Sequence, residues 1–501
     1  MEILDTTLRD GEQTSGVSFA SSEKLHIARL LIVDLNVDRV EIASAKVSDG
    51  EFETVKRVAG WAATRNYLNK IEVLGFVDGD VSLNWVKNAG CKVMNLLCKG
   101  SLKHCKEQLR KTPEKHLDDI LMVLKKAEAM DISINIYLED WSNGMLHSPD
   151  YVFYIIDNLK DTKIKRFMLP DTLGVLNPIN TGKFCRAMLE RYPGLHFDYH
   201  AHNDYDLAVG NVFAASHAGI QGIHATINGL GERAGNAPLA SVIAILHDQL
   251  KLQTNIIEDN LNRVSRIVES YSGIRIPNNK PLTGENVFTQ CAGIHADGDN
   301  KNKLYYNDLL PERFGRVRAY ALGKTSGKSN IKKNLEAMGI ELDEDTMRKV
   351  MERIIELGDK KEIVTQDDLP YIISDILHTE NVNKIKVVNY SLSLTHGLRP
   401  TATVRIEIDG KEYEQTAPGD GQYHAFSKAL WKIYTNLGKS KPDLKDYNVS
   451  ISAGGRTDAL VQTTIAWNFN GKEFKTRGLD IDQTVAAIKA TVKMLNMIEK
   501  M

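Results

Sequence analysis

No run of apolar residues in this sequence approaches the roughly 20 that a membrane-spanning helix needs, so we expect no membrane crossing. Basic residues are not in excess, since 63 Lys and Arg stand against 65 Asp and Glu, and a net charge of -2 offers no footprint for nucleic acid. The opening residues MEILDTTLRDG lack the basic and then apolar layout of a secretory signal. These absences predict a cytoplasmic protein.

Cysteine is scarce and shows no metal-binding spacing. The five thiols are Cys91, Cys98, Cys105, Cys185 and Cys291, an odd number with no CxxC pair. Cys91 and Cys98 bracket a predicted strand, so their seven-residue spacing has no geometric meaning. We therefore expect reduced thiols with structural roles.

The first half of the chain alternates short β-branched runs with longer amphipathic segments. The runs span residues 2–8, 38–44, 70–76, 91–97, 132–138, 164–170, 195–201 and 220–227. Parallel strands with helical crossovers give this pattern, and eight units in about 250 residues are typical of a closed (β/α)8 barrel. A doubly wound open sheet alternates in the same way, so a second criterion is needed.

The second half changes character twice. Residues 278–381 begin with an irregular stretch rich in Gly, Asn and Asp and continue as two predicted helices. Residues 382–501 read as strand, strand and helix, and then repeat that order. We therefore predict an α/β protein with a (β/α)8 TIM barrel at 1–277, a helical linker subdomain at 278–381, and a C-terminal α+β domain with internal pseudo-symmetry at 382–501.

Polar clusters supply the second criterion, because they follow the predicted strands at the same end. They are Arg9-Asp10 after the first strand, Glu139-Asp140 after the fifth, Asp171-Thr172 after the sixth, 200–204 after the seventh and 228–236 after the eighth. Barrel enzymes carry their catalytic residues just past the C-terminal ends of the strands. The distribution favours the barrel over the open sheet.

A metal site is predicted at His200, His202 and Asp10. Two histidines two residues apart at a strand end leave the same face, and a carboxylate from the adjacent first strand completes a set with open positions. The alternative is a hydrogen-bonded core pair of histidines. Asn236 could be a further oxygen ligand or could equally cap the next helix. The segment GLGERAG lacks the GxGxxG spacing and is interpreted as a tight turn beside the metal.

Open positions on a divalent ion suit a 2-oxo acid bound through its carboxylate and keto oxygens. Arg9 could stabilise developing oxyanion charge and Glu139 could transfer protons, with a structural ion pair as the alternative for both. Leu74, Leu97 and Tyr137 lie near the ends of neighbouring strands and predict a small apolar wall with no cation for a second carboxylate. Such a wall favours the methyl group of pyruvate over the second carboxylate of 2-oxoglutarate.

With the motifs LDTTLRDGEQTSGVSF, HAHND and NGLGERAGNAPL, the chain resembles the metal-dependent barrel synthases of the 2-isopropylmalate, homocitrate and citramalate synthase family. The resemblance extends to AGIHADG, GGRTDALVQTTIAW and DQTVAAIKATVKML, hence over nearly the whole chain. Through LGFVDGD, NLLCKGSLKH, YLEDWSNG and LPERFGR it is most similar to the (R)-citramalate synthases. HAHND has Ala201 where relatives often carry Gly, which should not disturb ligation.

The resemblance implies condensation of acetyl-CoA with pyruvate, followed by thioester hydrolysis, to give (R)-citramalate and CoA in isoleucine biosynthesis. It implies Mn2+, Mg2+ or Zn2+ on Asp10, His200 and His202, and a homodimer in which the linker reaches the partner's barrel. The side chains that would hold the 2-oxo acid are Arg9, Tyr137 and Thr172. The side chains that would perform acid/base chemistry are Glu139, His295 and Tyr305.

The C-terminal domain contributes none of the predicted ligands and resembles the feedback domain of this family. That implies a branched-chain amino acid effector at a dimer interface, which for a citramalate route would be isoleucine. The candidate pocket residues are Tyr423, Leu444, Tyr447, Ile451, Val461, Ile481 and Gln483. Each of the apolar ones could equally be ordinary core.

Other activities remain as alternatives. The nearest is 2-isopropylmalate synthase, which would condense acetyl-CoA with 2-oxoisovalerate in leucine biosynthesis. A barrel lyase or aldolase is more remote, because the related lyases carry a cysteine after the eighth strand and 226–241 contains none. A non-haem iron oxygenase shares the ligand set but not usually the fold. A non-catalytic amino-acid sensor would not explain the barrel site.

Overall fold

The computed structural model of this protein forms two compact units. The first comprises Met1–Gln290 with His295–Tyr320, and the second comprises Cys291–Ile294 with Ala321–Met501. The structure describes all residues except 302, 360–363, 365, 378–384, 452–460 and 500–501. Among the described residues, no helix combines the length and the apolar character that a membrane crossing requires.

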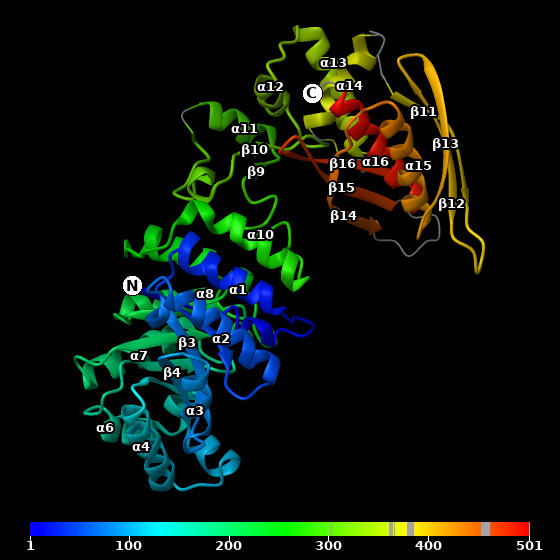
Figure 1. The fold of residues 1–501 in the computed structure, drawn as a ribbon. Helices are drawn as coiled ribbons and strands as arrows, with labels where there is room; N and C mark the ends of the chain where they lie inside the picture. The colour runs from blue at the N-terminus through cyan, green and yellow to red at the C-terminus, as the bar shows by residue number, and fades with distance from the viewer. Residues whose placement is uncertain (302, 360–363, 365, 378–384, 452–460, 500–501) are drawn as a thin grey trace. The chain divides into compact units, whose positions relative to one another are not determined.

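Eight parallel strands in the first unit close into a barrel, in which β1 pairs with β8. Figure 1 draws the barrel in blue to green, with β3 and β4 labelled. The strands are β1 (Glu2–Asp5), β2 (Arg39–Ser44), β3 (Ile71–Phe76), β4 (Val93–Lys99), β5 (Ser133–Glu139), β6 (Phe167–Asp171), β7 (Phe197–Ala201) and β8 (Gly222–Ala225). Each strand overlaps one of the eight predicted runs, so the closed barrel is confirmed and the open sheet is excluded.

Helices form the outer layer of the barrel. They are α1 (Ser21–Arg29), α2 (Asp49–Ala63), α3 (Val81–Asn88), α4 (Pro113–Ala129), α5 (Trp141–His147), α6 (Pro149–Leu159), α7 (Pro178–Arg191), α8 (Ala208–Ala218), α9 (Leu239–Ala244) and α10 (Leu261–Ser272). Strand residues such as Val73 and Leu96 pack in the large apolar core with the helices. Their neighbours Glu72 and Asn95 are equally buried but polar. Because side chains alternate along a strand, the apolar set faces the helices and the polar set faces the barrel interior.

The linker region contains more helix than expected. Its elements are β9 (Thr289–Gln290), α11 (Gly293–Asn300), β10 (Ala319–Tyr320), α12 (Lys328–Ala337), α13 (Glu344–Asp359) and α14 (Leu369–Leu377). The two predicted helices are present as α12 and α13. Helix α11 forms inside the stretch predicted to be irregular, where two glycines disfavour a helix. Tertiary contacts support it, because Asp299 is buried and pairs with Arg318 at 3.2 Å.

The C-terminal region repeats one unit of three antiparallel strands and a helix. The elements are β11 (Ile385–Ser393), β12 (Thr401–Ile408), β13 (Lys411–Pro418), α15 (Gln422–Asn436), β14 (Asp443–Ile451), β15 (Val461–Phe469), β16 (Lys472–Asp480) and α16 (Gln483–Ile498). The predicted internal pseudo-symmetry is confirmed, but each repeat has a third strand that was not predicted. β13 and β16 follow Asp409-Gly410 and Asn470-Gly471, whose positive φ angles are those of tight hairpin turns.

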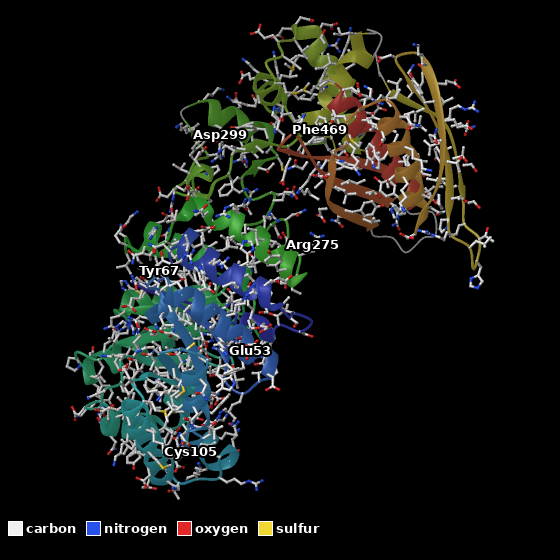
Figure 2. All side chains as sticks on the ribbon, in the orientation of Figure 1. Glu53, Tyr67, Cys105, Arg275, Asp299 and Phe469 are labelled. Atoms are coloured by element: carbon white, nitrogen blue, oxygen red, sulfur yellow. The ribbon has the colours of Figure 1, made fainter. Side chains whose placement is uncertain are left out.

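All five cysteines are free thiols, as expected. Four are buried and Cys291 is exposed. Cys105, labelled in Figure 2, is one of the buried ones.

Candidate functional site

Asp10, His200 and His202 converge at the C-terminal end of the barrel. Asp10 follows β1, His200 belongs to β7, and His202 lies just beyond it. Oδ2 of Asp10 is 3.3 Å from Nε2 of His200 and 3.7 Å from Nε2 of His202. The three side chains are buried, and one ligand atom from each lies within 4.8 Å of the others. This group has the spacing of a metal site.

The protonation states of these residues fit a divalent cation. Burial lowers the pKa of His200 and of His202 to about 4, so both imidazoles are neutral at pH 7 and keep a lone pair for a metal. Burial alone would raise the pKa of Asp10, but Arg9 and His200 outweigh it and hold that pKa well below its usual range. One carboxylate and two neutral imidazoles are a common donor set for transition-metal and related ions.

Asn236 is available as a fourth donor. Its Nδ2 donates to the carbonyl of Leu230 at 3.2 Å, but its Oδ1 is buried without a hydrogen-bond partner among the described residues. Asn236 also forms an isolated β-bridge with His202, which holds it beside the ligand set. Helix α9 begins two residues after Ala237 with Pro238 at its N-cap and no side-chain cap. The structure therefore does not support the helix-cap alternative.

The GLGERAG segment forms a tight turn against the site. The backbone N–H of Glu232 lies 3.4 Å from Oδ1 of Asp10. Gly231 has a φ of +157° and a Cβ there would come within 2.3 Å of the Asn236 amide nitrogen. At Gly235, with a φ of +84°, a Cβ would come within 2.0 Å of the Gly229 carbonyl oxygen. Gly231 is thus required by the close approach of this turn to Asn236, and Gly235 by the close approach of the turn to the Gly229 carbonyl.

Arg9 belongs to both an ion-pair network and the candidate site. Its Nε is 2.5 Å from Glu41, its Nη1 is 3.1 Å from Asp10, and its side chain is 10% exposed. Burial by itself would lower the pKa of Arg9, but Glu41 and Asp10 raise it above its usual value. Arg9 is therefore a fixed cation that borders the metal ligands.

The three predicted wall residues lie together. Leu74 and Tyr137 pack with Leu4 and Met168 in a small cluster of their own, and the half-buried Leu97 packs against it. Leu97 and Tyr137 are direct partners in the β4–β5 register. We call this cluster the apolar wall. It is separate from the main apolar core, in which the barrel strands pack against the helices.

Glu139 ends β5 and pairs with a cation that the sequence did not single out. Its carboxylate forms an ion pair with Nζ of Lys99, at the end of β4, and its side chain is 22% exposed. The sequence had predicted no cation near the wall, yet Lys99 is two residues beyond Leu97 on the same strand face. The hydroxyl of Thr172 accepts the backbone N–H of Asp140 at 2.8 Å, so it helps to shape the loop after β5.

His295 and Tyr305 are brought together outside the barrel strands. Their ring centroids are 4.3 Å apart. Tyr305 lines a cavity of about 930 Å³ together with Asn203, which follows the metal-ligand candidates in sequence. Within the described residues, no hydrogen bond or ion pair joins either side chain to Arg9, Glu139 or the convergent ligands.

Four of the seven predicted effector residues line a cavity of about 600 Å³ in the C-terminal region, namely Tyr423, Leu444, Tyr447 and Gln483. Val461 is buried on β15 and Ile481 is 64% exposed, and neither lines this cavity. The side chain of Ile451 lies outside the described set.

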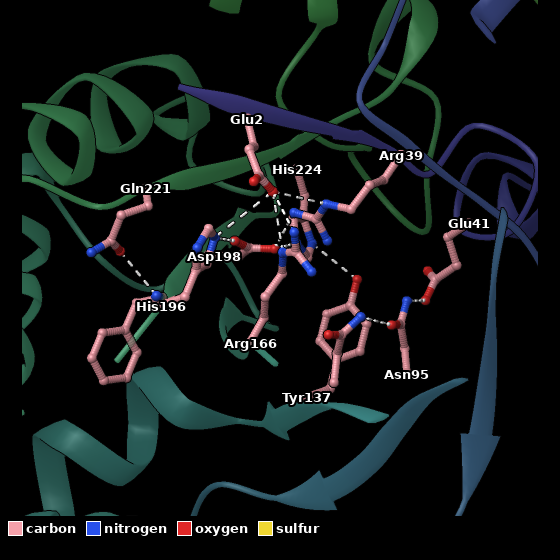
Figure 3. Close-up of polar contacts among 12 residues, drawn as sticks. Glu2, Arg39, Glu41, Asn95, Tyr137, Arg166, His196, Asp198, Gln221 and His224 are labelled. Carbon is pink, nitrogen blue, oxygen red and sulfur yellow. Dashed lines mark hydrogen bonds and ion pairs between the residues drawn. The ribbon is translucent and has the colours of Figure 1, made fainter. Parts of the chain in front are cut away.

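The sequence reasoning missed a polar network inside the barrel. It contains Glu41, Asn95, Asp198 and His224, all essentially buried (Figure 3). It reaches the candidate site through Glu41, which accepts a hydrogen bond from Nε of Arg9. A signal was present, because side chains two apart on a strand share a face. Asp198 lies two residues before His200, and Asn95 two before Leu97.

Comparisons with known proteins agree with this architecture. A family model described as HMGL-like matches residues 1–268. A model described as homocitrate synthase post-HMGL domain-like matches residues 282–362. The LeuA allosteric (dimerisation) domain matches residues 363–499.

Curated relatives match over nearly the whole chain. The (R)-citramalate synthase of Methanocaldococcus jannaschii is 32% identical over 501 residues, which cover 99% of this chain and 99% of that protein. The 2-isopropylmalate synthase of the same organism is 33% identical over 515 residues, covering 99% and 94%. The 2-isopropylmalate synthase of Nitratidesulfovibrio vulgaris is 30% identical over 513 residues, covering 100% and 97%. The chain therefore belongs to the HMGL-like family and is an enzyme of its citramalate and 2-isopropylmalate synthase branch.

Proposed function

We propose that this enzyme is an acyltransferase that condenses acetyl-CoA with pyruvate to give (R)-citramalate and CoA. The observation that carries the proposal is the apolar wall beside Arg9 and the three convergent ligands. A methyl group fits a wall of two leucines and a tyrosine ring. The second carboxylate of 2-oxoglutarate would have to break the ion pair between Lys99 and Glu139 to find a cation there.

Asp10, His200 and His202, with Asn236, would hold the divalent cation, Mn2+, Mg2+ or Zn2+, which when bound polarises the keto group of the 2-oxo acid. Arg9 would donate to the oxyanion that develops at the keto oxygen. The methyl carbon of the acetyl group loses a proton and forms a bond to the keto carbon of pyruvate. The keto oxygen gains a proton. Water then cleaves the thioester, which releases CoA and the free acid.

Glu139 is the proposed acid/base group for these proton transfers. It stands at the end of β5, on the same strand face as Tyr137, and its side chain is 22% exposed, so it borders the substrate space. The ion pair with the ammonium of Lys99 holds this carboxylate in place at the end of the strand. Thr172, on the loop after β6, would bind the substrate carboxylate.

His295 and Tyr305 would assist this chemistry across a homodimer. The close approach of their rings, whose planes are tilted by 36°, and the exposure of Tyr305, at 41%, are compatible with a role toward another subunit. Mixing His295→Ala subunits with Glu139→Gln subunits should then restore part of the activity in heterodimers. Verified subunit exchange without any restoration would refute action across the dimer.

The C-terminal cavity is the proposed effector site for isoleucine. Tyr423, Leu444 and Tyr447 offer apolar surface for an aliphatic side chain, and Lys441 and Gln483 line the same cavity as polar partners. Isoleucine should inhibit more strongly than leucine, with a coupling on the order of 1–3 kcal/mol. Tighter binding of leucine in titration calorimetry would favour the 2-isopropylmalate route.

The deciding experiment measures CoA release from acetyl-CoA with pyruvate, 2-oxobutyrate or 2-oxoisovalerate, after chelation and after readdition of each metal. We expect no turnover without metal, the highest kcat/KM with pyruvate, and slower use of 2-oxobutyrate. Chiral chromatography should identify the product as (R)-citramalate. A clear preference for 2-oxoisovalerate in competition would assign the enzyme to 2-isopropylmalate synthesis. Because Cys291 is exposed, a thiol-reagent assay needs an enzyme-only blank.

A further inference from the structure

The hydroxyl of Tyr137 faces away from solvent and into a buried chain of hydrogen bonds (Figure 3). The hydroxyl oxygen lies 2.9 Å from Nδ1 of His224, and Nε2 of His224 lies 3.1 Å from Oδ2 of Asp198. All three residues are at most 2% exposed. They come from β5, β8 and β7, so the chain crosses the barrel interior.

The partners of Asp198 determine where the protons lie. Its Oδ2 accepts from Arg39 at 2.5 Å, and its Oδ1 faces Nε2 of His196 at 2.8 Å. A carboxylate held by a guanidinium is ionised and can only accept hydrogen bonds. Nε2 of His224 must therefore carry a proton toward Asp198. Gly222 leaves room for the Asp198 carboxylate, because a Cβ at position 222 would come within 1.9 Å of Oδ1 of Asp198.

The remaining nitrogen of His224 then acts as an acceptor. Among the described residues, the Tyr137 hydroxyl has two side-chain polar partners, Nδ1 of His224 and Nη2 of Arg9, and a guanidinium can only donate. Nδ1 of His224 is therefore the acceptor that the buried hydroxyl requires, and the ring carries its proton on Nε2. Tyr137 consequently gives its only hydroxyl proton to His224. Its oxygen faces Nη2 of Arg9 at 3.4 Å, as an acceptor.

We infer that Asp198 and His224 are positioning residues for substrate selection, which keep the Tyr137 hydroxyl from hydrogen-bonding the 2-oxo acid. The ring of Tyr137 then offers the substrate only apolar surface, and its oxygen helps to aim Arg9. The ring is also fixed edge-on to the ligand candidate His200, with centroids 6.2 Å apart and planes at 89°. The role in substrate selection rests on the proposed function, because it assumes a 2-oxo acid as the substrate. The direction of the hydrogen bond from Tyr137 to His224 does not depend on that function.

A double-mutant cycle tests the inference through kcat/KM for pyruvate. His224→Leu removes the acceptor and frees the hydroxyl, so we expect a loss of about 10- to 100-fold and a changed preference between pyruvate and 2-oxobutyrate. In a Tyr137→Phe background the same substitution should cost less than about threefold, because no hydroxyl remains to be held. His224→Gln, whose amide oxygen can accept, should restore part of the wild-type preference. Equal losses in both backgrounds would overturn the inference.

Tyr199 offers a matched control. It is a fully buried tyrosine of β7 that belongs to the main apolar core, in which the strands pack against the helices. Its hydroxyl contacts Thr181 at 3.5 Å. His224→Leu and Tyr199→Phe should therefore have independent effects. Coupling of similar size in this control pair would mean that His224 acts by general packing, and would overturn the proposed positioning role.

A spectroscopic measurement separates the inference from the proposed function. In long-range proton–nitrogen spectra of the enzyme labelled with 15N-histidine, the resonance lost in His224→Gln should show the neutral form protonated at Nε2. A ring protonated at Nδ1 alone, or at both nitrogens, would overturn the inference. Because this measurement uses no substrate, absence of CoA release by the wild-type enzyme would refute the proposed function while leaving the hydrogen-bond direction tested.

Discussion

Substitution of Leu97 by alanine should enlarge the substrate space at the apolar wall and change the order of substrates. Leu97 is half-buried, packs on the cluster of Leu74 and Tyr137, and pairs with Tyr137 across β4 and β5. The change removes three carbons, whereas 2-oxoisovalerate carries two carbons more than pyruvate. One methylene in an apolar pocket discriminates by about 1–3 kcal/mol. Room for even one of the two extra carbons should therefore raise the ratio of kcat/KM for 2-oxoisovalerate to that for pyruvate roughly 5- to 150-fold.

Leu96 is the matched control on the same strand. It is fully buried but packs in the core outside the strands, with the helices. Leu96→Ala should cost about 2–5 kcal/mol of stability and leave the substrate ratio unchanged. The assay is a competition among the 2-oxo acids with products quantified by mass spectrometry. An equal shift in Leu96→Ala, or no shift in a well-folded Leu97→Ala enzyme, would refute the wall as the selecting surface.

Three further predictions follow from the site and its surroundings. His200→Ala should lose tight binding of the divalent cation in metal analysis, together with activity; a stoichiometric metal in that variant would contradict the ligand assignment. Glu139→Gln should retain the metal but lose about 100-fold or more in kcat, and a near-normal rate would move the acid/base role elsewhere. Burial lowers the pKa of His116 to about 4, so the unfolded chain binds a proton that the folded chain does not, and stability falls as the pH drops from about 6.5 toward 4. In His116→Gln, urea unfolding at pH 7 and pH 5 should show that fall reduced by about 2 kcal/mol; an unchanged fall would exclude His116 as a contributor.

The barrel was predictable because each of its strands lies in a short run rich in apolar and β-branched residues, followed by a longer segment of helical character. The prediction of the C-terminal repeats was less complete, since β13 and β16 are strands with several charged residues at the third position of each sheet. Their only local signal is the hairpin turn, Asp409-Gly410 or Asn470-Gly471, which a search for apolar runs overlooks. Helix α11 depends on the buried ion pair between Asp299 and Arg318, which is distant information that local propensity does not contain.

Some residues of the candidate site could be predicted from the sequence and others could not. Asp10, His200 and His202 could be located from strand ends, because parallel strands deliver their last residues to one rim. Lys99 and His224 were missed, since a single polar residue within an apolar strand has many ordinary explanations. Their significance emerges only when β4 pairs with β5, which sets Lys99 beside Glu139, and when closure of the barrel brings His224 to Tyr137.

The two C-terminal repeats share one apolar core, and this has a consequence for how that part of the chain folds. Val404 and Ile406 from the first repeat and Ile465 and Trp467 from the second belong to the same buried cluster, with both helices contributing. Neither half can remove its apolar face from water without the other. Unfolding of one repeat should therefore carry the other with it in a single cooperative transition. A chain cut within the segment that joins them, residues 437–442, should lose both halves together.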